Sequence, residues 1–417
     1  MGFSKDVDVL VVGGGPAGLL AAETTASAGL STLVLEREPE IGDPVRTSGG
    51  TSVETMRRFD IPDRFYHVLK RLRFCSLREE AAFEFQEPVG CIIDVRGMYR
   101  HLAERASSKG ASILTGANVE SLIFEGGEIA GCNVKSGTSG DFDVRSKIVI
   151  DASGHRASLS KQAKLHDGFT RFGVGAEYDL SAPHCNQEEA LLIVGSQYAP
   201  AGYAWVFPWG EDRVRVGVGI LHSDGRANPK DYLADVMEDI HRFGVDLTGS
   251  EIREYHFGLM PSSGLAHQFA GDRIMAAGDA AGQATLVAGE GIRLSMQAGL
   301  MAGQAAVQAI SDGTWDRSAL ISYEQTFKSK YARNLRISHF INERIATWGD
   351  DQWDQHIRVL KTIPPKTLAK LLQSEFAVPE ILAWILLKPA LWPRAVRYLR
   401  RFLFHRLGKS KEILEES

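Results

Sequence analysis

The chain has 417 residues, a formal net charge of −5, and a composition that is 44% hydrophobic and 24% charged. This length exceeds what a single small core needs, and the composition is ordinary for a globular protein. The acidic balance argues against a general nucleic-acid-binding function. The 12 histidines have no metal-ligand spacing, so we expect no metal site.

The cysteine pattern and the amino terminus indicate a cytoplasmic protein. The thiols lie far apart and form no CxxC pair, at Cys75, Cys91, Cys132 and Cys185. We expect them to be small buried residues rather than a disulfide framework. The amino terminus runs at once into an apolar strand and a glycine loop, which does not fit a cleaved secretory signal. No stretch reaches the roughly 18 apolar residues of a membrane-spanning helix.

Residues 1–36 have the pattern of a βαβ unit. An apolar run at 7–12 predicts a buried strand, the Ala-rich stretch at 16–28 a helix, and 33–36 a second strand. The loop between the first strand and the helix fits GxGxxG, with the sequence Gly13-Gly14-Gly15-Pro16-Ala17-Gly18.

Each glycine of this loop has a separate expected use. Gly13 permits the tight turn, Gly15 lets the backbone approach a pyrophosphate, and Gly18 allows the helix to pack closely on the strand. Pro16 and Ala17 open the helix, whose amino terminus faces the anion. An ordinary glycine turn is the alternative, but the flanking strand and helix favour a dinucleotide site.

The end of the second strand supplies an acid at the expected place. Glu36 suits a carboxylate that accepts hydrogen bonds from a ribose hydroxyl, and its neighbour Arg37 is assigned to the same cofactor site. Beyond it, 37–90 is interpreted as helical pieces and loops, and 95–109 as a helix that ends at Gly110.

The middle of the chain changes character. Residues 111–152 alternate strand and turn signals, whereas 170–222 is rich in Val, Tyr, Phe and Trp and predicts an antiparallel sheet. A helix at 231–243 and a return strand at 251–260 follow. At 273–310 the chain again shows a strand, a glycine loop and a long helix.

The segment at 273–282, Arg-Ile-Met-Ala-Ala-Gly-Asp-Ala-Ala-Gly, resembles the second FAD fingerprint of flavoprotein reductases and hydroxylases. That resemblance implies that Asp279 bonds the ribityl chain of FAD; an Asp that merely caps a helix is the alternative. We therefore predict an α/β fold with a discontinuous Rossmann-like FAD-binding domain at 1–165 and 260–310. An antiparallel-sheet substrate domain at 166–259 is inserted into it, and a helical region follows at 311–417.

Further segments narrow the class. They are Pro-Glu-Ile-Gly-Asp-Pro-Val-Arg at 39–46, Pro-Ala-Gly-Tyr-Ala-Trp-Val-Phe-Pro at 200–208, Gly-Val-Gly at 217–219 and Gly-Glu-Gly-Ile at 289–292. Together they resemble the geranylgeranyl reductase family of flavoproteins, in the p-hydroxybenzoate hydroxylase-like superfamily. The resemblance covers residues 7 to about 310, and the aromatic motif followed by GxG is its most specific part.

The resemblance implies an FAD that delivers hydride to a carbon–carbon double bond of an isoprenoid chain. Tyr203 and Trp205, with Phe207, would line a tunnel for that chain beside the flavin; an ordinary aromatic sheet core is the alternative. No second GxGxxG is present, so the electrons would come from NAD(P)H that docks transiently or from a ferredoxin or other reductase partner. The resemblance also assigns to the cofactor Arg46, Thr47, Arg96, Val119, Asp279, Gly289, Gly291 and Ile292.

The chain departs from the family pattern near the expected flavin. Many members have Cys-Gly-Glu-Gly after Pro-Val-Arg, whereas this chain has Thr47-Ser48-Gly49-Gly50, and Thr285-Leu286-Val287-Ala288 stands where a proline is usual. An FAD-dependent reductase that saturates a prenyl chain stays the leading interpretation, and the loss of the Cys-Gly-Glu-Gly run supports its rival, an FAD-dependent monooxygenase or oxidative tailoring enzyme. A non-catalytic flavoprotein that binds prenyl lipids is a second rival.

The carboxyl-terminal segment 376–411 interleaves Trp, Leu and Phe with Arg and Lys. Such a basic amphipathic segment is typical of a peptide that lies on an anionic membrane surface. A lid that packs on the protein body is the alternative. The sequence therefore predicts a cytoplasmic protein with peripheral membrane contact as one interpretation of this segment.

Overall fold

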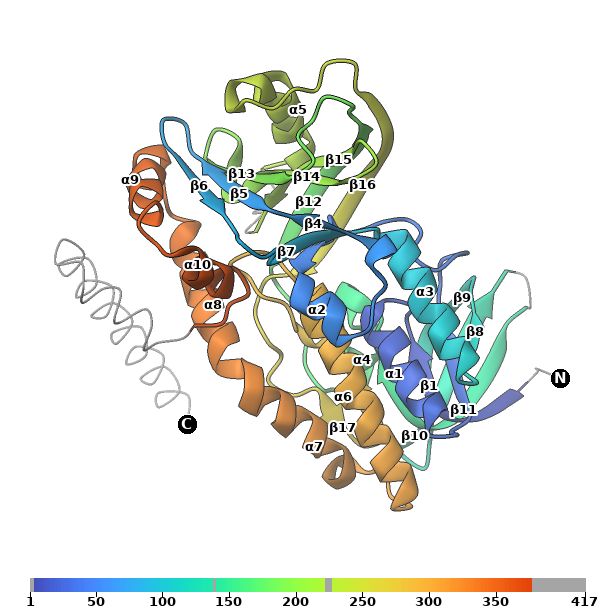
Figure 1. The fold of residues 1–417 in the computed structure, drawn as a ribbon. Coiled ribbons are helices and arrows are strands. Elements are labelled where there is room, and N and C mark those ends of the chain that lie inside the picture. The colour runs from blue at the N-terminus through green and yellow to red at the C-terminus, as the bar shows by residue number, and fades with distance from the viewer. Residues whose placement is uncertain (1–3, 138–139, 222–226, 377–417) are drawn as a thin grey trace, which may run out of the picture.

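The computed structural model describes residues 4–137, 140–221 and 227–376. Two main β-sheets lie one above the other in Figure 1, with helices along the lower sheet and at one end of the upper sheet. Within the described residues, no helix is both long enough and apolar enough to cross a membrane.

The first sheet carries the predicted βαβ unit. Its strand β1 (Ser4–Val12) pairs in parallel with β2 (Thr32–Leu35) and β11 (Phe142–Asp151), and β18 (Ile274–Ala276) continues the sheet beyond β11. The strands 7–12, 33–36 and 148–150 and the return of the chain near 273 are thereby confirmed. The remaining strands of this sheet are β8 (Ser112–Leu114), β9 (Ala117–Glu125), β10 (Glu128–Ser136) and β17 (Ala270–Gly271).

Three helices cover this sheet, and the hydrophobic core lies between the helices and the strands. The helices are α1 (Pro16–Ser27), α3 (Val95–Ser108) and α6 (Ile292–Ser311). Asp94 directly precedes helix α3, and its side chain accepts a hydrogen bond from the Gly97 amide at 3.0 Å and caps the first turn. The predicted helices at 16–28 and 95–109 are confirmed to within a residue.

The second sheet has the strand order β16-β12-β15-β14-β13-β5-β6. Its strands are β5 (Arg71–Cys75), β6 (Glu80–Glu84), β12 (Phe172–Ser181), β13 (Glu189–Gly195), β14 (Ala199–Gly210), β15 (Arg213–Ile220) and β16 (Glu251–Pro261). Helix α5 (Pro229–Asp239) packs on β15 and β12. The antiparallel sheet predicted from 170–222 and 251–260 is present, and the helix near 231 is confirmed.

The interpretation of 37–90 as helical pieces and loops is wrong. Besides the short helix α2 (Val53–Arg58), this segment forms strands, two of which join the second sheet. Strand β6 reads Glu-Ala-Ala-Phe-Glu and alternates exposed and buried residues, with Ala81 and Phe83 inward, so the period of two was present but short. The second sheet therefore extends beyond the predicted domain at 166–259. A small third sheet joins β3 (Gly50–Ser52), β4 (Tyr66–Leu69) and β7 (Gly90–Ile93).

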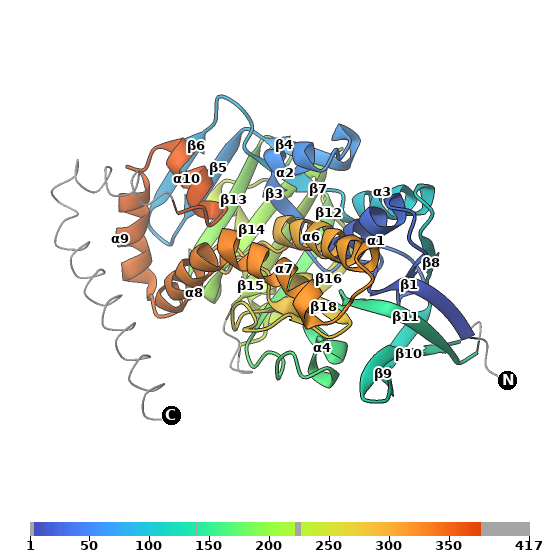
Figure 2. The ribbon, with the colours of Figure 1, turned by 90° about the horizontal axis from the view of Figure 1, so that it is seen from below.

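The helical region after 311 reaches back to the second sheet. Figure 2 shows its last described helices at the end of that sheet formed by β5 and β6. Asp354, which is buried on helix α9 (Asp350–Leu360), accepts hydrogen bonds from the Ser76 hydroxyl at 2.6 Å and the Arg78 Nε at 2.6 Å. The helices are α7 (Arg317–Phe327), α8 (Arg333–Ile345), α9 (Asp350–Leu360) and α10 (Pro365–Leu372). Apart from Phe376, the basic segment at 376–411 lies outside the described residues.

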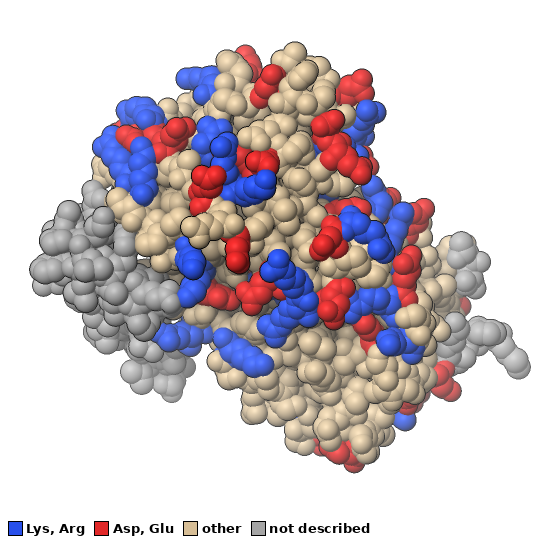
Figure 3. All heavy atoms as spheres, in the orientation of Figure 1, with Lys and Arg blue, Asp and Glu red and all other residues tan. Residues whose placement is uncertain are grey.

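The charged side chains form local pairs. On the face drawn in Figure 3, acidic and basic side chains lie next to one another across the upper and middle parts of the described surface. Examples are Lys70 with Glu188 and Arg105 with Glu23. The cysteines are all buried and free, as expected.

Helices α1 and α6 cross at backbone contact distance. A Cβ atom on Gly299 would lie 2.0 Å from the Ala17 carbonyl oxygen, and one on Gly303 would lie 3.0 Å from the Ala21 carbonyl oxygen. Glycine at these positions is therefore required by the approach of the helices rather than by helix propensity, which favours alanine. This contact fixes the start of α1, and with it the glycine loop.

We predict that Gly299→Ala destabilises the protein by about 1–3 kcal/mol, as overpacking does, even though alanine is the better helix former. The exposed Gln304→Ala on the same helix is the matched control and should leave the melting temperature unchanged. Thermal unfolding followed by circular dichroism measures both. A Gly299→Ala protein as stable as the wild type would show that the helices can separate without cost.

Candidate active site

The glycine loop has the geometry that a bound pyrophosphate needs. Gly13 has φ of 113°, and a Cβ there would lie 2.2 Å from the Ala152 carbonyl oxygen. A Cβ on Gly18 would lie 2.0 Å from the Gly13 carbonyl oxygen, whereas one on Gly15 would meet nothing within 4 Å. Gly13 and Gly18 are therefore required by packing, while Gly15 faces open space at the amino terminus of α1.

That space belongs to two connected cavities. The nucleotide cavity, of about 520 Å³, extends from the glycine loop to β9 and is lined by Gly13, Gly15, Glu36 and Val119. The central cavity, of about 340 Å³, extends from Gly15, Pro16 and Ala17 to the second sheet. The two share Gly15, Arg37, Arg46 and Thr47. An extended dinucleotide would follow this path, with its phosphates next to Gly15.

Glu36 is held in a fixed orientation beside the loop. Its Oε2 accepts a hydrogen bond from the Gly14 amide at 2.6 Å, and its Oε1 accepts one from the Glu38 amide at 2.9 Å. The two cavity-lining arginines both pair with one oxygen, Glu38 Oε1, from Arg37 Nε at 3.1 Å and Arg46 Nη2 at 2.6 Å. Both arginines line the two cavities together with Gly15, the predicted phosphate position.

Arg96 is held by two ion pairs next to the nucleotide cavity. It does not line the nucleotide or the central cavity but pairs with Asp43 Oδ1 at 2.6 Å and Glu254 Oε2 at 3.0 Å. These contacts tie the loop at 43–46 to strand β16. Arg96 therefore holds two parts of the wall together, and its predicted contact with the cofactor stays a prediction.

The segment at 273–282, which resembles the second FAD fingerprint, also borders the central cavity. Asp279 lies in a single 3-10 turn (Gly278–Ala281) directly after β18, and burial raises its pKa to about 6. The long helix α6 begins at Ile292, after the glycine loop, in the predicted order of strand, loop and helix. Gly289, Gly291 and Ile292, which precede or open that helix, line the cavity as well.

The aromatic strand β14 presents its side chains to the cavity wall. Trp205 lines the central cavity, and its Nε1 donates a hydrogen bond to Glu177 Oε2 at 3.0 Å. Its indole lies over the glycines of β15, since a Cβ on Gly217 would lie 2.3 Å from Trp205 Cζ2 and one on Gly219 would lie 3.2 Å from Cζ3. The Gly-Val-Gly that follows the aromatic motif in sequence is thus the floor on which its tryptophan rests.

Sequence reasoning missed a buried ionisable pair in the same wall. His256 Nδ1 lies 2.8 Å from Glu177 Oε1, and both side chains line the central cavity. They are 6% and 4% exposed. Nothing local marks His256 as paired with an acid 79 residues earlier. Only the pairing of β12 with β16 brings them together.

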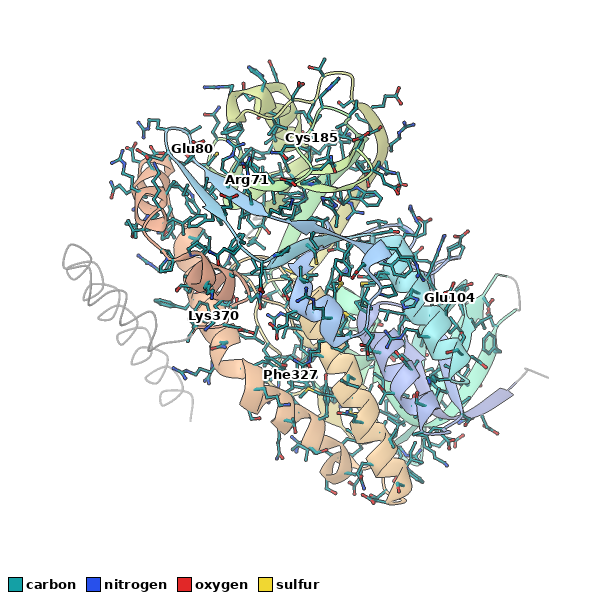
Figure 4. All side chains as sticks on the ribbon, viewed as in Figure 1. Arg71, Glu80, Glu104, Cys185, Phe327 and Lys370 are labelled. Carbon is teal, nitrogen blue, oxygen red and sulfur yellow. The ribbon has the colours of Figure 1, made fainter. Side chains whose placement is uncertain are left out.

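A third, apolar cavity of about 530 Å³ adjoins the central one. Figure 4 labels Arg71 on β5 and Lys370 on α10, and the cavity lies between these two elements. Its wall includes apolar side chains from the second sheet and from α9 and α10, such as Phe74, Leu192, Phe207, Ile357, Leu360, Leu368 and Leu372. The helical region therefore closes the space that β5, β13 and β14 leave open.

The apolar and central cavities share Thr47, Tyr203, Gly289, Gly291 and Ile292 among their lining residues. The Tyr203 hydroxyl donates a hydrogen bond to the Ala288 carbonyl, which fixes the phenol ring between the two spaces. An apolar ligand can thus reach whatever occupies the central cavity. Within the described residues, no group of three or more His, Cys, Asp or Glu side chains could hold a metal ion.

Comparisons with known proteins agree with this geometry. The model of the FAD-binding domain family matches residues 6–336. Digeranylgeranylglycerophospholipid reductase 2 of Methanothermobacter thermautotrophicus is 32% identical over 371 residues, which are 87% of this chain and 94% of that protein. The digeranylgeranylglycerophospholipid reductase of Methanosarcina acetivorans is 32% identical over 395 residues, 91% of this chain and 95% of that protein.

Solved structures show the same fold. A geranylgeranyl bacteriochlorophyll reductase-like protein from Thermoplasma acidophilum superposes with a TM-score of 0.84 at 26% identity, covering 96% of this chain and all of that one. The p-nitrophenol 4-monooxygenase of Pseudomonas putida shares the fold at a TM-score of 0.67 and 17% identity, covering 91% of this chain and 98% of that one. The cofactor of this chain is FAD, and the nucleotide and central cavities are the space that can hold it.

We predict that Gly15→Val abolishes FAD retention, because the new side chain would occupy the open space at the loop without clashing with protein atoms. Gly349 is the matched control: it precedes α9 with nearly the same backbone angles and also faces open space. The ratio of flavin to protein after purification should fall to near zero for Gly15→Val and stay normal for Gly349→Val. A Gly15→Val protein that purifies with its full complement of FAD would contradict the assignment of the loop.

Proposed function

Because the chain belongs to the geranylgeranyl reductase family of FAD-dependent oxidoreductases, we propose that it saturates carbon–carbon double bonds of an isoprenoid chain carried by a lipid or a prenylated metabolite. The relatives named above are digeranylgeranylglycerophospholipid reductases, which makes a phospholipid with geranylgeranyl chains the first substrate to test. FAD, when bound, supplies the hydride; the protein must supply the fit for the chain and the access for a proton.

The observation that carries this proposal is the apolar cavity that opens into the central cavity (the flavin cavity). Its lining is dominated by aliphatic and aromatic side chains, which suit a hydrocarbon chain and offer little to a small polar substrate. Since the two spaces meet at Thr47, Tyr203 and Gly291, a double bond can lie against the flavin while the rest of the chain stays among Phe74, Leu192 and the carboxyl-terminal helices.

The chain's own residues divide the work between the two spaces. Tyr203 and Thr47 lie at the opening, where they would contact the reacting part of the substrate. Trp205 faces only the central cavity, and its bond to Glu177 holds the indole against the glycine floor, where it would contact the flavin. Phe207, two residues on, lines the apolar cavity instead. The predicted tunnel wall is thus divided: Trp205 lines the central cavity, Phe207 lines the apolar cavity and Tyr203 lines both.

Thr47 stands where many family members have a cysteine. Its place at the opening between the cavities makes it a substrate-contacting residue in this proposal, and its hydroxyl can hydrogen-bond but cannot act as a thiolate. The electron donor would be NAD(P)H or a ferredoxin. Peripheral contact with a membrane through 376–411 would bring a lipid substrate to the apolar cavity, whose lining includes Phe376 at the start of that segment.

We predict that dithionite-reduced enzyme, mixed anaerobically with a geranylgeranylated phospholipid, reoxidises its flavin as the product gains two hydrogens per double bond. Flavin absorbance and product mass measure the two events together. A flavin that stays reduced until oxygen is admitted, and then forms an oxygen adduct, would show that the protein is a monooxygenase rather than a reductase. A flavin that reacts with neither would favour a lipid-binding role.

We also predict that Leu192→Trp lowers kcat/KM for long prenyl substrates by at least tenfold while the flavin content stays normal, because the larger ring fills the apolar cavity. Ile252→Trp is the control, since Ile252 is 58% exposed on β16 and lines none of the three cavities. Steady-state kinetics with chains of different length measures the effect. Equal losses for short and long chains would contradict the cavity as the site of the chain.

A further inference from the structure

The wall of the flavin cavity contains a histidine between two carboxylates. His256 Nδ1 lies 2.8 Å from Glu177 Oε1, and its Nε2 lies 3.1 Å from Glu254 Oε2. An ionised carboxylate only accepts hydrogen bonds, whereas a neutral imidazole has one donor and one acceptor nitrogen. A neutral ring would therefore set a lone pair against one of the two carboxylates. The contacts on both sides are satisfied together when the ring is an imidazolium.

The surrounding charges support the same protonation state. We define the His256 cluster by the ionisable groups that connect to this ring: Asp43, Arg96, Glu177, Asp179, Arg213, Arg215, Glu254 and His256. Its four carboxylates face three arginines, so a protonated His256 makes the cluster neutral. Without that proton, one uncompensated negative charge would remain in a wall where His256, Glu177 and Arg215 are each at most 6% exposed, which is costly.

The surroundings of His256 raise its pKa, as expected for an imidazolium between two carboxylates. Burial acts to lower the pKa of His256, but the hydrogen bonds to Glu177 and Glu254 outweigh this and raise the pKa above its ordinary value of 6.5. The hydrogen bond from Arg96 lowers the pKa of Glu254 to about 2, so that partner stays ionised at neutral pH. The remaining ionisable groups that line the central cavity are Arg37, Arg46, Tyr99, His155, Tyr203 and Asp279.

We propose that His256, held as an imidazolium between Glu177 and Glu254, places a buried positive charge against the flavin cavity that favours the anionic reduced flavin over the oxidised flavin. Reduction of FAD by a nicotinamide nucleotide or a ferredoxin takes up two electrons and one proton and leaves one negative charge on the ring system. A cation in a poorly solvated wall stabilises that charge. This inference concerns the cofactor and does not depend on the identity of the substrate.

The test is the midpoint potential of the bound flavin. His256→Gln should lower it at pH 6, because a negative cluster then faces the reduced ring. We expect a loss of at least tenfold in the preference for the reduced over the oxidised flavin, or about 30 mV for a two-electron couple. Because His256 is charged below its pKa and neutral above it, the difference from wild type should shrink as the pH rises through that pKa.

His155 offers a matched control in the same cavity. Burial lowers its pKa, and Arg156, Arg37 and Arg46 lower it further, so at pH 6 it carries less positive charge than His256 and His155→Gln should shift the potential less than His256→Gln does. His256→Lys keeps a cation and should hold the potential near the wild-type value at pH 6. Unchanged potential in His256→Gln at pH 6, or an equal shift in His155→Gln, would overturn the proposal.

A second variant covers the case in which His256→Gln loses its flavin. Glu177→Gln keeps an oxygen for the Trp205 Nε1 and removes one charge that favours the imidazolium. The pH at which the histidine contribution to the potential disappears should then move downward relative to wild type. An unmoved inflection in the plot of potential against pH would sink the proposal independently of His256→Gln.

Discussion

The buried guanidinium of Arg215 joins the second sheet to the segment that borders both the flavin and the apolar cavities. Its Nη1 donates hydrogen bonds to the Ser48 carbonyl at 2.8 Å and the Ile93 carbonyl at 3.0 Å, and its Nε faces Asp179 at 3.4 Å. The side chain is 2% exposed. A buried cation without these partners would be costly, so strand β15 and residues 47–50 must lie in this one arrangement. The opening between the cavities, at Thr47, follows from it.

The other constraint on the site is the absence of side chains at glycines. Gly13 and Gly18 let the loop turn against Ala152 and α1, and Gly217 and Gly219 leave room for the Trp205 indole. Gly299 lets α6 approach α1. In each case a Cβ atom would meet backbone or a fixed ring, so the neighbour could not simply move aside. The cofactor cavities exist because these contacts hold the first sheet, its helices and the aromatic strand at fixed separations.

Two kinds of signal made part of this site predictable. The loop at 13–18 and the acid at Glu36 lie within one βαβ unit, where the spacing of residues along the chain is enough to predict their relative positions in the structure. Asp279 was placed by its own strand and turn. By contrast, Arg96 was assigned to the cofactor from the family resemblance, and that contact stays a prediction. Its ion pairs with Asp43 and Glu254 depend on strand β16, more than 150 residues later.

The sequence by itself determined the nucleotide-binding unit, the aromatic strand and the likeness to an FAD-dependent family, because each rests on short-range patterns. The tertiary structure alone decided that β5 and β6 extend the second sheet, that α9 and α10 close an apolar cavity against them, and that His256 lies between two acids. These contacts join residues far apart in the chain. Their side chains carry no local mark of their partners, since burial and charge pairing are properties of the packed elements rather than of any one segment.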